Sequence, residues 1–224
     1  MIRAIITDIE GTTTSVSFVY DVLFPYAREH MAAFIHQHRD DQIVREQLQL
    51  VSLESGSKLD EDLAIAQLLT WMEADKKITP LKTLQGLIWE HGYQQGHFKG
   101  HIYDDVPRNL RRWHAQGIAL YVYSSGSVQA QKLLFANTAE GDLTGLFSGY
   151  FDTRIGNKRE STSYERIVNQ TGLAAQQLLF LSDIEQELEA AEQAGLKTVL
   201  LVRDTDKPAG SYHQVHNFDQ IQID

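Results

Sequence analysis

Two patterns of hydrophobic and polar positions divide the chain. Residues 2–9 form an apolar run in which hydrophobic residues follow one another with little alternation. From about residue 16 to residue 100, apolar residues recur three or four positions apart, as at Tyr20, Phe24 and Ala27. The first pattern is typical of a buried strand and the second of amphipathic helices. The sequence therefore predicts one strand followed by a long helical segment.

Beyond residue 100, short apolar runs alternate with stretches of helical spacing. Strands are expected at 118–125, 149–152, 178–183 and 197–202, with a last edge strand within 213–221. Helices are expected between them, and one of these carries a capping-box pattern that pairs Thr162 with Glu165. Because apolar strands separated by helices form a parallel sheet that is covered on both faces, the sequence predicts an α/β fold.

The position of the helical segment predicts a two-domain organisation. The segment interrupts the chain after the first strand and before all the others. A chain of 224 residues is long enough for a core domain with a smaller insert. We therefore expect residues 1–15 and 101–224 to form the core domain and residues 16–100 to form the inserted helical domain.

The overall composition argues against several kinds of partner. With 30 acidic and 20 basic residues, the formal net charge is −10, which disfavours nucleic acid and anionic membranes because phosphate groups attract Lys and Arg. The absence of cysteine excludes disulfides and thiolate metal sites. No apolar run reaches the roughly 18 residues that a bilayer span needs. We expect a cytoplasmic monomer that acts on a small molecule and binds neither nucleic acid nor membranes.

Polar side chains follow three of the expected strands at the point where each strand ends. Asp8 follows the first, Ser124 and Ser125 end the second, and Asp183 ends a later one. Ligands of parallel α/β sheets bind beyond the carboxyl ends of the strands, so we expect these side chains to share one crevice. Each also has a structural alternative, because Asp and Ser at strand ends often cap the next helix.

The acids at this edge point to metal-dependent chemistry. Two carboxylates at neighbouring strand ends repel each other unless a cation lies between them, and Mg²⁺ is a hard cation that prefers oxygen ligands. Glu10 lies two residues after Asp8, so in an extended chain the two acids share a face. That arrangement suits a nucleophile and a general acid–base on opposite sides of one bond.

The residues beside these acids can bind an anion. Gly11 permits a tight turn that brings backbone N–H groups to an anion, and Thr12 can bind the same anion or cap the turn. The hydroxyls of Ser124 and Ser125 can donate to phosphate oxygens, and Gly126 lets the backbone approach closely. The alternative for the two serines is that they cap the following helix.

Two further charged residues have competing interpretations. Lys158 lies in a polar loop before a helix, from which it could neutralise both a nucleophile and a phosphate; the alternative is a solvated lysine. Glu187 is interpreted as a helix-face acid, with a contact to a metal-bound water as the alternative.

The order of these groups resembles the four motifs of the haloacid dehalogenase superfamily of phosphohydrolases. The motifs are strand–D-x-E-G-T, strand–S-S-G, loop–K and strand–S-D-x-x-x-E. Within the superfamily the chain is similar to the enolase-phosphatases of methionine salvage, also called acireductone synthases. The closer match lies in "DIEGTT" (8–13), "GLIWEHGY" (86–93), "GHIYDDVP" (100–107), "YSSGSVQAQKLLF" (123–135) and "FLSDIEQELEAAEQAGL" (180–196).

The resemblance implies a Rossmann-like parallel-sheet core with an inserted all-helical cap. It implies that Asp8 is the nucleophile that takes the phosphoryl group. One Mg²⁺ would be held by the side chains of Asp8 and Asp183 and by the backbone carbonyl of Glu10. The phosphate would be bound by the two serines of the S-S-G motif and by Lys158.

The implied substrate is 5-methylthio-2,3-diketopentyl 1-phosphate, which is enolised and dephosphorylated to the acireductone. Glu10 stands where most phosphatases of the superfamily have Asp, and it is our candidate for the base that removes the C1 proton. Two alternatives remain open. One is a phosphatase for another small phosphate ester, and the other is a phosphometabolite-binding domain without catalytic activity.

Overall fold

The computed structural model describes residues 1–203 and 212–223, and the chain divides into two compact units. The core unit consists of Met1–Val16 and Lys99–Asp224, and the helical unit consists of Ser17–Phe98. The predicted strand and the predicted α/β region thus lie together in one unit. The use of the helical unit as a cap over the substrate remains a prediction.

A parallel sheet forms the centre of the core unit. Within the described residues it has six strands in the order β3-β2-β1-β4-β5-β6, and every neighbouring pair is parallel. The strands are β1 (Ala4–Thr7), β2 (Ala119–Tyr123), β3 (Gly149–Phe151), β4 (Leu178–Ser182), β5 (Lys197–Leu201) and β6 (Gln214–Val215). The predicted α/β class is confirmed. The expected last edge strand is shorter than 213–221, because the chain turns into a 3₁₀-helix at Phe218–Gln220.

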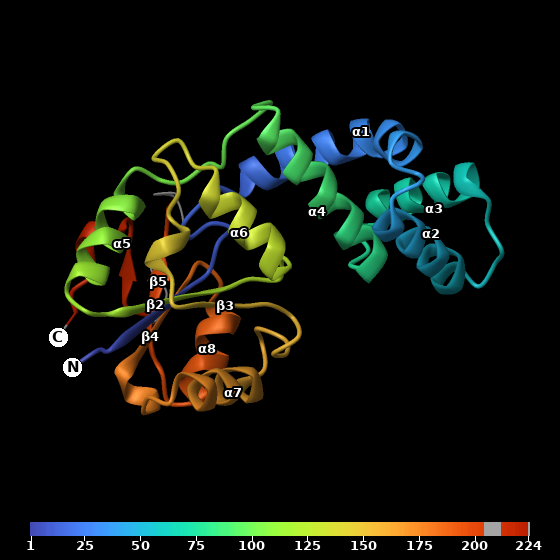
Figure 1. Cartoon of the computed structure of the whole chain (residues 1–224). Helices are drawn as coiled ribbons and strands as arrows, with labels where there is room; N and C mark the ends of the chain where they lie inside the picture. Colours follow the sequence, from blue (N-terminus) through green and yellow to red (C-terminus); the bar gives the residue numbers. More distant parts are fainter. Residues whose placement is uncertain (204–211, 224) are drawn as a thin grey trace. The chain divides into compact units, whose positions relative to one another are not determined.

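Helices cover both faces of this sheet. They are α5 (Asp105–Ala115), α6 (Val128–Ala136), α7 (Ser161–Thr171) and α8 (Glu185–Gln193), with short 3₁₀ turns at Thr144–Leu146 and Ala175–Gln177. Figure 1 shows α7 and α8 on one face and α5 and α6 on the other. All four residues of β1 are buried, as expected for a central strand covered on both sides.

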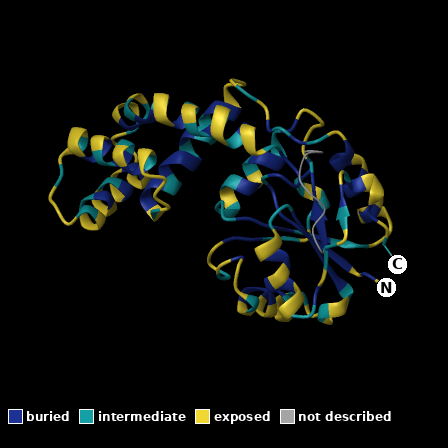
Figure 2. Cartoon of the chain, turned by 180° about the vertical axis from the view of Figure 1, so that it is seen from behind, coloured by how far each residue is buried: buried dark blue, intermediate teal, exposed yellow. Residues whose placement is uncertain are grey.

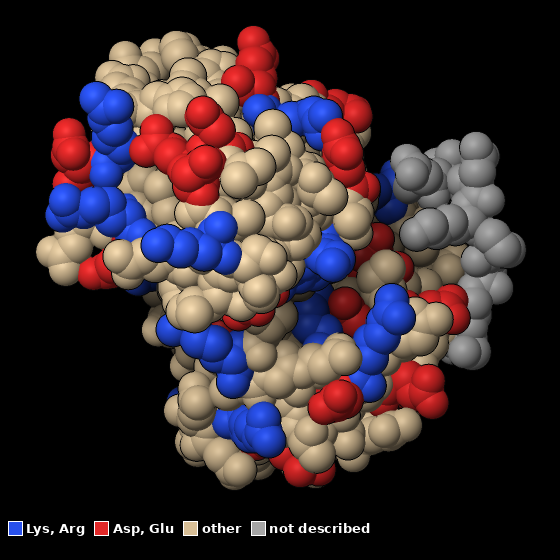
Figure 3. Space-filling view, turned by 90° about the vertical axis from the view of Figure 1, so that its right-hand side faces the viewer, with Lys and Arg blue, Asp and Glu red and all other residues tan. Residues whose placement is uncertain are grey.

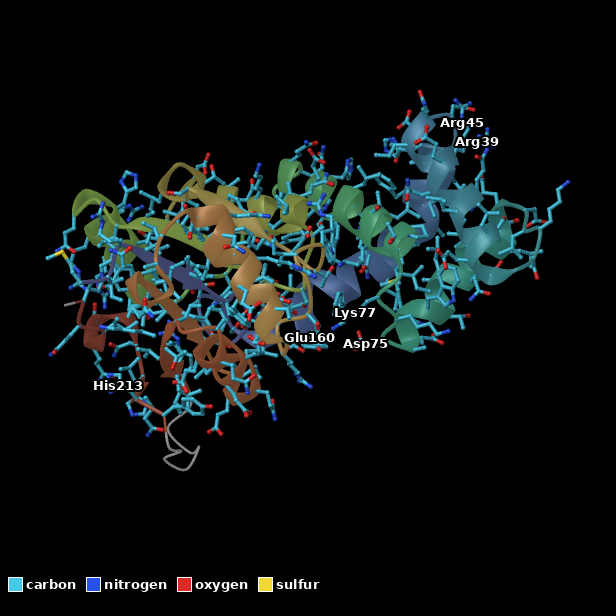
Figure 4. The ribbon with its side chains drawn as sticks, turned by 90° about the horizontal axis from the view of Figure 1, so that it is seen from below. Arg39, Arg45, Asp75, Lys77, Glu160 and His213 are labelled. Atoms are coloured by element: carbon cyan, nitrogen blue, oxygen red, sulfur yellow. The ribbon has the colours of Figure 1, made fainter. Side chains whose placement is uncertain are left out.

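The capping box predicted at Thr162 and Glu165 is wrong. Helix α7 begins at Ser161, so Thr162 lies inside the helix rather than at its N-cap. The N-cap residue is Glu160, labelled in Figure 4, and its side chain makes no capping hydrogen bond. The side chain of Ser163 instead donates to the carbonyl of Asn157 in the preceding loop, so loop contacts replace the expected cap.

The helical unit contains no strand in its described residues. It begins with a π-helical turn at Phe18–Leu23 and continues with α1 (Phe24–Gln37), α2 (Gln42–Ser55), α3 (Glu61–Glu73) and α4 (Thr79–Gln94). The buried residues lie along the sides on which these helices pack together (Figure 2), and they include Ala27, Met31, Ile35, Val51, Leu68, Trp71, Leu84 and Ile88. The predicted all-helical character of this segment is confirmed.

The surface is mixed in charge. On the face that Figure 3 shows, basic and acidic side chains are interspersed. No helix in the described residues is both long enough and apolar enough to cross a membrane.

A buried ion pair fastens the loop after β1 to the rest of the core unit. Arg203, just after β5, donates from Nη1 to both carboxylate oxygens of Asp105 at 2.8 and 2.9 Å. Its Nε donates to the carbonyl of Thr12 at 3.0 Å. Asp105 also accepts the backbone N–H of Phe218 at 2.7 Å. The pair therefore links the β1 loop, the start of α5 and the C-terminal segment.

We predict that Asp105→Ala lowers the free energy of unfolding by about 3–5 kcal/mol, because it leaves the buried guanidinium of Arg203 without its partner. Asp104→Ala is the matched control, since Asp104 is exposed and makes no side-chain capping bond; it should change stability by less than about 0.5 kcal/mol. Urea unfolding followed by circular dichroism measures both variants. Equal midpoints for the two would contradict the assigned role of the pair.

Candidate active site

The sheet order brings the predicted site residues to one edge of the core. Strand β1 lies between β2 and β4, so Asp8, which follows β1, is flanked by the residues that follow those two strands. The backbone N–H of Asp8 bonds to the carbonyl of Leu181 at 2.9 Å. Ser124 follows β2 and Asp183 follows β4. The residues expected to share a crevice therefore come from adjacent strand ends.

Lys158 lies between two carboxylates at the centre of this edge. Its Nζ is 2.6 Å from Oδ1 of Asp8 and 2.6 Å from Oε2 of Glu187. All three side chains are buried or nearly so, with Lys158 only 8% exposed. The hydroxyl of Ser182 donates to Glu187 at 2.9 Å and holds that carboxylate in place. The alternative interpretation, in which Lys158 is a solvent-exposed lysine of a polar loop, is therefore wrong.

The charges of this cluster depend on one another. Burial, followed by the carboxylates of Glu187 and Glu10, raises the pKa of Asp8 well above its usual value, and the Lys158 ammonium opposes that rise. Burial disfavours the charge on Lys158, but the carboxylates of Asp8 and Glu187 outweigh it and raise the pKa of the ammonium. Lys158 therefore stays protonated, and it is the group that favours the ionised form of Asp8.

The role of Glu187 was underestimated from the sequence. Its interpretation as a helix-face acid is wrong, because the side chain is buried against Lys158 and Ser182. A signal was available in the spacing. Glu187 lies in the first turn of the helix that begins two residues after Asp183, so the S-D-x-x-x-E pattern places it near the same strand end.

The S-S-G turn after β2 has a different structure from that of a helix cap. Ser124 accepts the N–H of Gly126 at 3.1 Å, and its hydroxyl donates toward Glu10 at 3.5 Å. The cap of α6 is supplied by Ser127, which accepts the N–H of Ala130 at 3.2 Å. The capping alternative for Ser124 and Ser125 is therefore wrong, and their role in phosphate binding remains a prediction.

Asp183 lies against the loop that follows β1. Gly11 has φ +73°, and a Cβ atom built there would lie only 2.3 Å from Oδ2 of Asp183. Any other residue at position 11 would therefore displace this carboxylate and also strain the backbone. The N-cap residue of α8 is Ile184, so Asp183 does not cap that helix. Its carboxylate lies beside Gly11 in the loop that follows Asp8.

Thr12 is placed less favourably for substrate contact. The residue is fully buried, and Arg203 binds its carbonyl from the core side. Its hydroxyl has no hydrogen-bond partner among the described residues. Thr12 therefore supports the β1 loop through its backbone, and its assignment as a phosphate ligand remains a prediction.

We predict that Lys158→Met makes stability depend strongly on pH. Without the ammonium, the pKa of Asp8 in the folded protein rises further. The folded state therefore loses stability as the pH rises above the pKa that Asp8 has in the unfolded chain. The loss should reach about 3–5 kcal/mol at pH 8 and be much smaller at pH 4. Urea unfolding in EDTA measures this. Lys197→Met, at an exposed strand start, is the control and should keep the pH dependence of the unmodified chain. A loss in Lys158→Met that does not grow with pH would refute the electrostatic account.

Comparison with known proteins points to one family. Residues 2–195 match the family model of haloacid dehalogenase-like hydrolases. The enolase-phosphatase E1 of Methylococcus capsulatus is 54% identical over 223 residues, which cover 99% of this chain and 98% of that protein. The enolase-phosphatase E1 of Pseudomonas syringae pv. tomato is also 54% identical, with 98% and 97% covered.

Solved structures agree with the sequence matches. The UTR4 protein of Saccharomyces cerevisiae, whose crystal structure is known, is 33% identical to this chain and has a TM-score of 0.86. The match covers 99% of this chain and 100% of that one. The L-2-haloacid dehalogenase of Xanthobacter autotrophicus, at 18% identity and a TM-score of 0.55, shares the fold. The chain therefore belongs to the enolase-phosphatase E1 family of haloacid dehalogenase-like hydrolases.

Proposed function

We propose that this chain is an Mg²⁺-dependent enolase-phosphatase that converts 5-methylthio-2,3-diketopentyl 1-phosphate to the dephosphorylated acireductone in methionine salvage. The observation that carries the proposal is the buried contact between Asp8 and Lys158, at 2.6 Å, at the end of the central strand of the core sheet. The curated relatives that are 54% identical over nearly the whole chain carry the name of this activity. A cytoplasmic location and a monomeric state remain predictions.

In this proposal Asp8 acts as the nucleophile. Its carboxylate attacks phosphorus, the bond from phosphorus to the C1 oxygen breaks, and the phosphoryl group passes to Asp8. Water then attacks phosphorus and restores the free carboxylate. Lys158 supports both steps, because its ammonium favours the ionised carboxylate and can neutralise charge on the phosphoryl oxygens.

Glu10 is the proposed base for enolisation. It removes a proton from C1, and the electrons of that C–H bond form the double bond of the enol. Its carboxylate lies within reach of the Ser124 hydroxyl at 3.5 Å, which can orient it. If enolisation comes first, the leaving oxygen belongs to an enol, which is more acidic than an alcohol, so its departure depends less on a well-aligned proton donor.

The residues at this edge fit the proposed Mg²⁺. The donor set consists of hard oxygen atoms from Asp8, Asp183 and the Glu10 carbonyl, which is the chemistry that Mg²⁺ prefers. The close approach of Asp183 to Gly11 keeps its carboxylate beside the β1 loop. The described residues contain no group of three or more His, Asp or Glu side chains that could hold a metal, and the proposed set needs only two carboxylates. Bound there, Mg²⁺ would polarise the phosphoryl group and the adjacent carbonyl.

We predict that Asp8→Asn lowers phosphate release on the order of 10³-fold or more, because the amide is a poor nucleophile. Phosphate release from the diketone phosphate measures the effect. Asp142→Asn, at an exposed position, should retain the activity of the unmodified chain. An active Asp8→Asn protein would remove Asp8 from the nucleophile role.

The substrate assignment is tested on the unmodified chain. Purified protein receives the diketone phosphate with and without Mg²⁺, and ultraviolet absorbance of the ene-diol and free phosphate are recorded on one sample. We expect both signals to grow only with the metal. Phosphate without ene-diol would indicate an ordinary phosphatase and would remove the second role of Glu10. Neither signal from folded protein would contradict the substrate assignment.

A further inference from the structure

The loop that carries Lys158 is fastened through its backbone. Four consecutive carbonyls, at residues 155–158, each accept a hydrogen bond from a side chain. The pairs are Arg166 to Ile155 at 2.8 Å, Tyr123 to Gly156 at 3.1 Å, Ser163 to Asn157 at 2.8 Å and Tyr164 to Lys158 at 2.7 Å. Three of the donors come from the first half of α7 and one from the end of β2. We refer to residues 155–158 as the lysine loop.

The lysine loop also packs closely against α7. Gly156 has φ +142°, and a Cβ atom built there would lie 2.1 Å from the hydroxyl oxygen of Ser163. A side chain at position 156 would therefore push the loop away from the helix. The loop has neither a strand nor a helix of its own to fix it, so these contacts take over that role.

Tyr164 makes the contact on Lys158 itself, and it does so inside the core. The residue is fully buried, and its ring packs edge-on against Phe180 and Tyr123, with centroids 5.1 and 5.6 Å away. Burial raises the pKa of the Tyr164 hydroxyl, which therefore keeps its proton. Because the ring is held on two sides, the hydroxyl is directed at the Lys158 carbonyl.

We infer that Tyr164 is a positioning residue for phosphate binding and phosphoryl transfer, which it supports by fixing the backbone from which Lys158 reaches Asp8. The inference rests on the proposed function for its kinetic part. A lysine side chain has four rotatable bonds, so its ammonium is placed well only if its backbone is held. Without the hydroxyl, the Lys158 carbonyl loses its partner, and the loop can shift when a phosphate approaches the ammonium. Small misplacements of a charged group of this kind are costly for the reaction.

The test compares two variants that each lose one buried tyrosine hydroxyl. Tyr164→Phe removes the contact with Lys158 and keeps the ring. Tyr150→Phe is the control, because the Tyr150 hydroxyl is buried but has no hydrogen-bond partner among the described residues. Calorimetry measures the Kd for inorganic phosphate in Mg²⁺, steady-state kinetics measures kcat with the diketone phosphate, and thermal unfolding measures stability.

We expect Tyr164→Phe to raise the Kd for phosphate and to lower kcat, each about tenfold, and Tyr150→Phe to change neither. Equal Kd and kcat values in the two variants, or a Tyr164→Phe protein that loses only thermal stability, would overturn the inference. If Tyr164→Phe does not fold, Ser163→Ala, which frees the neighbouring Asn157 carbonyl, must raise the Kd by a smaller factor for the inference to stand.

The outcomes also separate this inference from the proposed function. If the unmodified chain binds phosphate but does not turn over the diketone, the proposed function fails, and the Kd values still decide the role of Tyr164. If the unmodified chain does not bind phosphate at all, Lys158 is not a phosphate ligand, and the inference fails with it.

Discussion

The site depends on one buried ammonium held between two carboxylates. Lys158 lies 2.6 Å from both Asp8 and Glu187, in a place where burial alone would favour the neutral forms of Lys158 and Asp8. Attraction between opposite charges is stronger away from water, so the ammonium can favour an ionised Asp8 that burial and neighbouring acids oppose. A nucleophilic carboxylate at this position therefore requires the lysine.

The rest of the core can be understood as the means of assembling this cluster. The central strand β1 supplies Asp8, the adjacent β4 ends beside Asp183, and α8 returns Glu187 to the same edge. The lysine comes from a loop between β3 and α7, which has no regular structure and is held by side-chain bonds to its carbonyls. The charged centre is thus formed by segments far apart in the sequence, each fixed to the sheet separately.

The chain also leaves and re-enters the core at neighbouring points. His101 Nδ1 accepts the backbone N–H of Ser15 at 3.0 Å and lies 2.9 Å from the Thr14 hydroxyl. The backbone N–H of Tyr103 donates to the carbonyl of Thr13 at 3.0 Å. The segment before the helical unit and the segment after it are therefore bonded to each other. This explains how more than eighty residues can be inserted after a four-residue strand without disturbing its pairing with β2 and β4.

The sequence predicted the strands and the site edge well because their signals are local. Apolar runs marked the strands of the sheet, and polar residues at the ends of those runs marked Asp8, Ser124 and Asp183. The errors concern contacts that need the tertiary structure. The pattern at Thr162 fits a capping box, yet the N-cap of the helix is Glu160, two residues earlier, and the first turn bonds to the lysine loop.

Lys158 and Glu187 show the same limit of local patterns. Each is a charged residue in a polar stretch, which usually indicates exposure. Both are buried because of tertiary contacts, in which Lys158 pairs with Asp8 and Glu187. The donors to the lysine loop are undetectable for a similar reason. Tyr164 has the sequence signature of an ordinary core aromatic, and the partner of its hydroxyl is a backbone carbonyl that no sequence pattern marks.

The central claim is that Asp8 carries the phosphoryl group during turnover. Borohydride reduces an aspartyl phosphate but leaves a free carboxylate intact, so it marks the residue that was phosphorylated. The most direct measurement is therefore to mix protein, Mg²⁺ and substrate, quench with borohydride within one turnover, and identify the reduced residue by peptide mass spectrometry. The account predicts reduction at Asp8 alone. Phosphate release at the full rate with Asp8 not reduced, or with another residue reduced in its place, would contradict it.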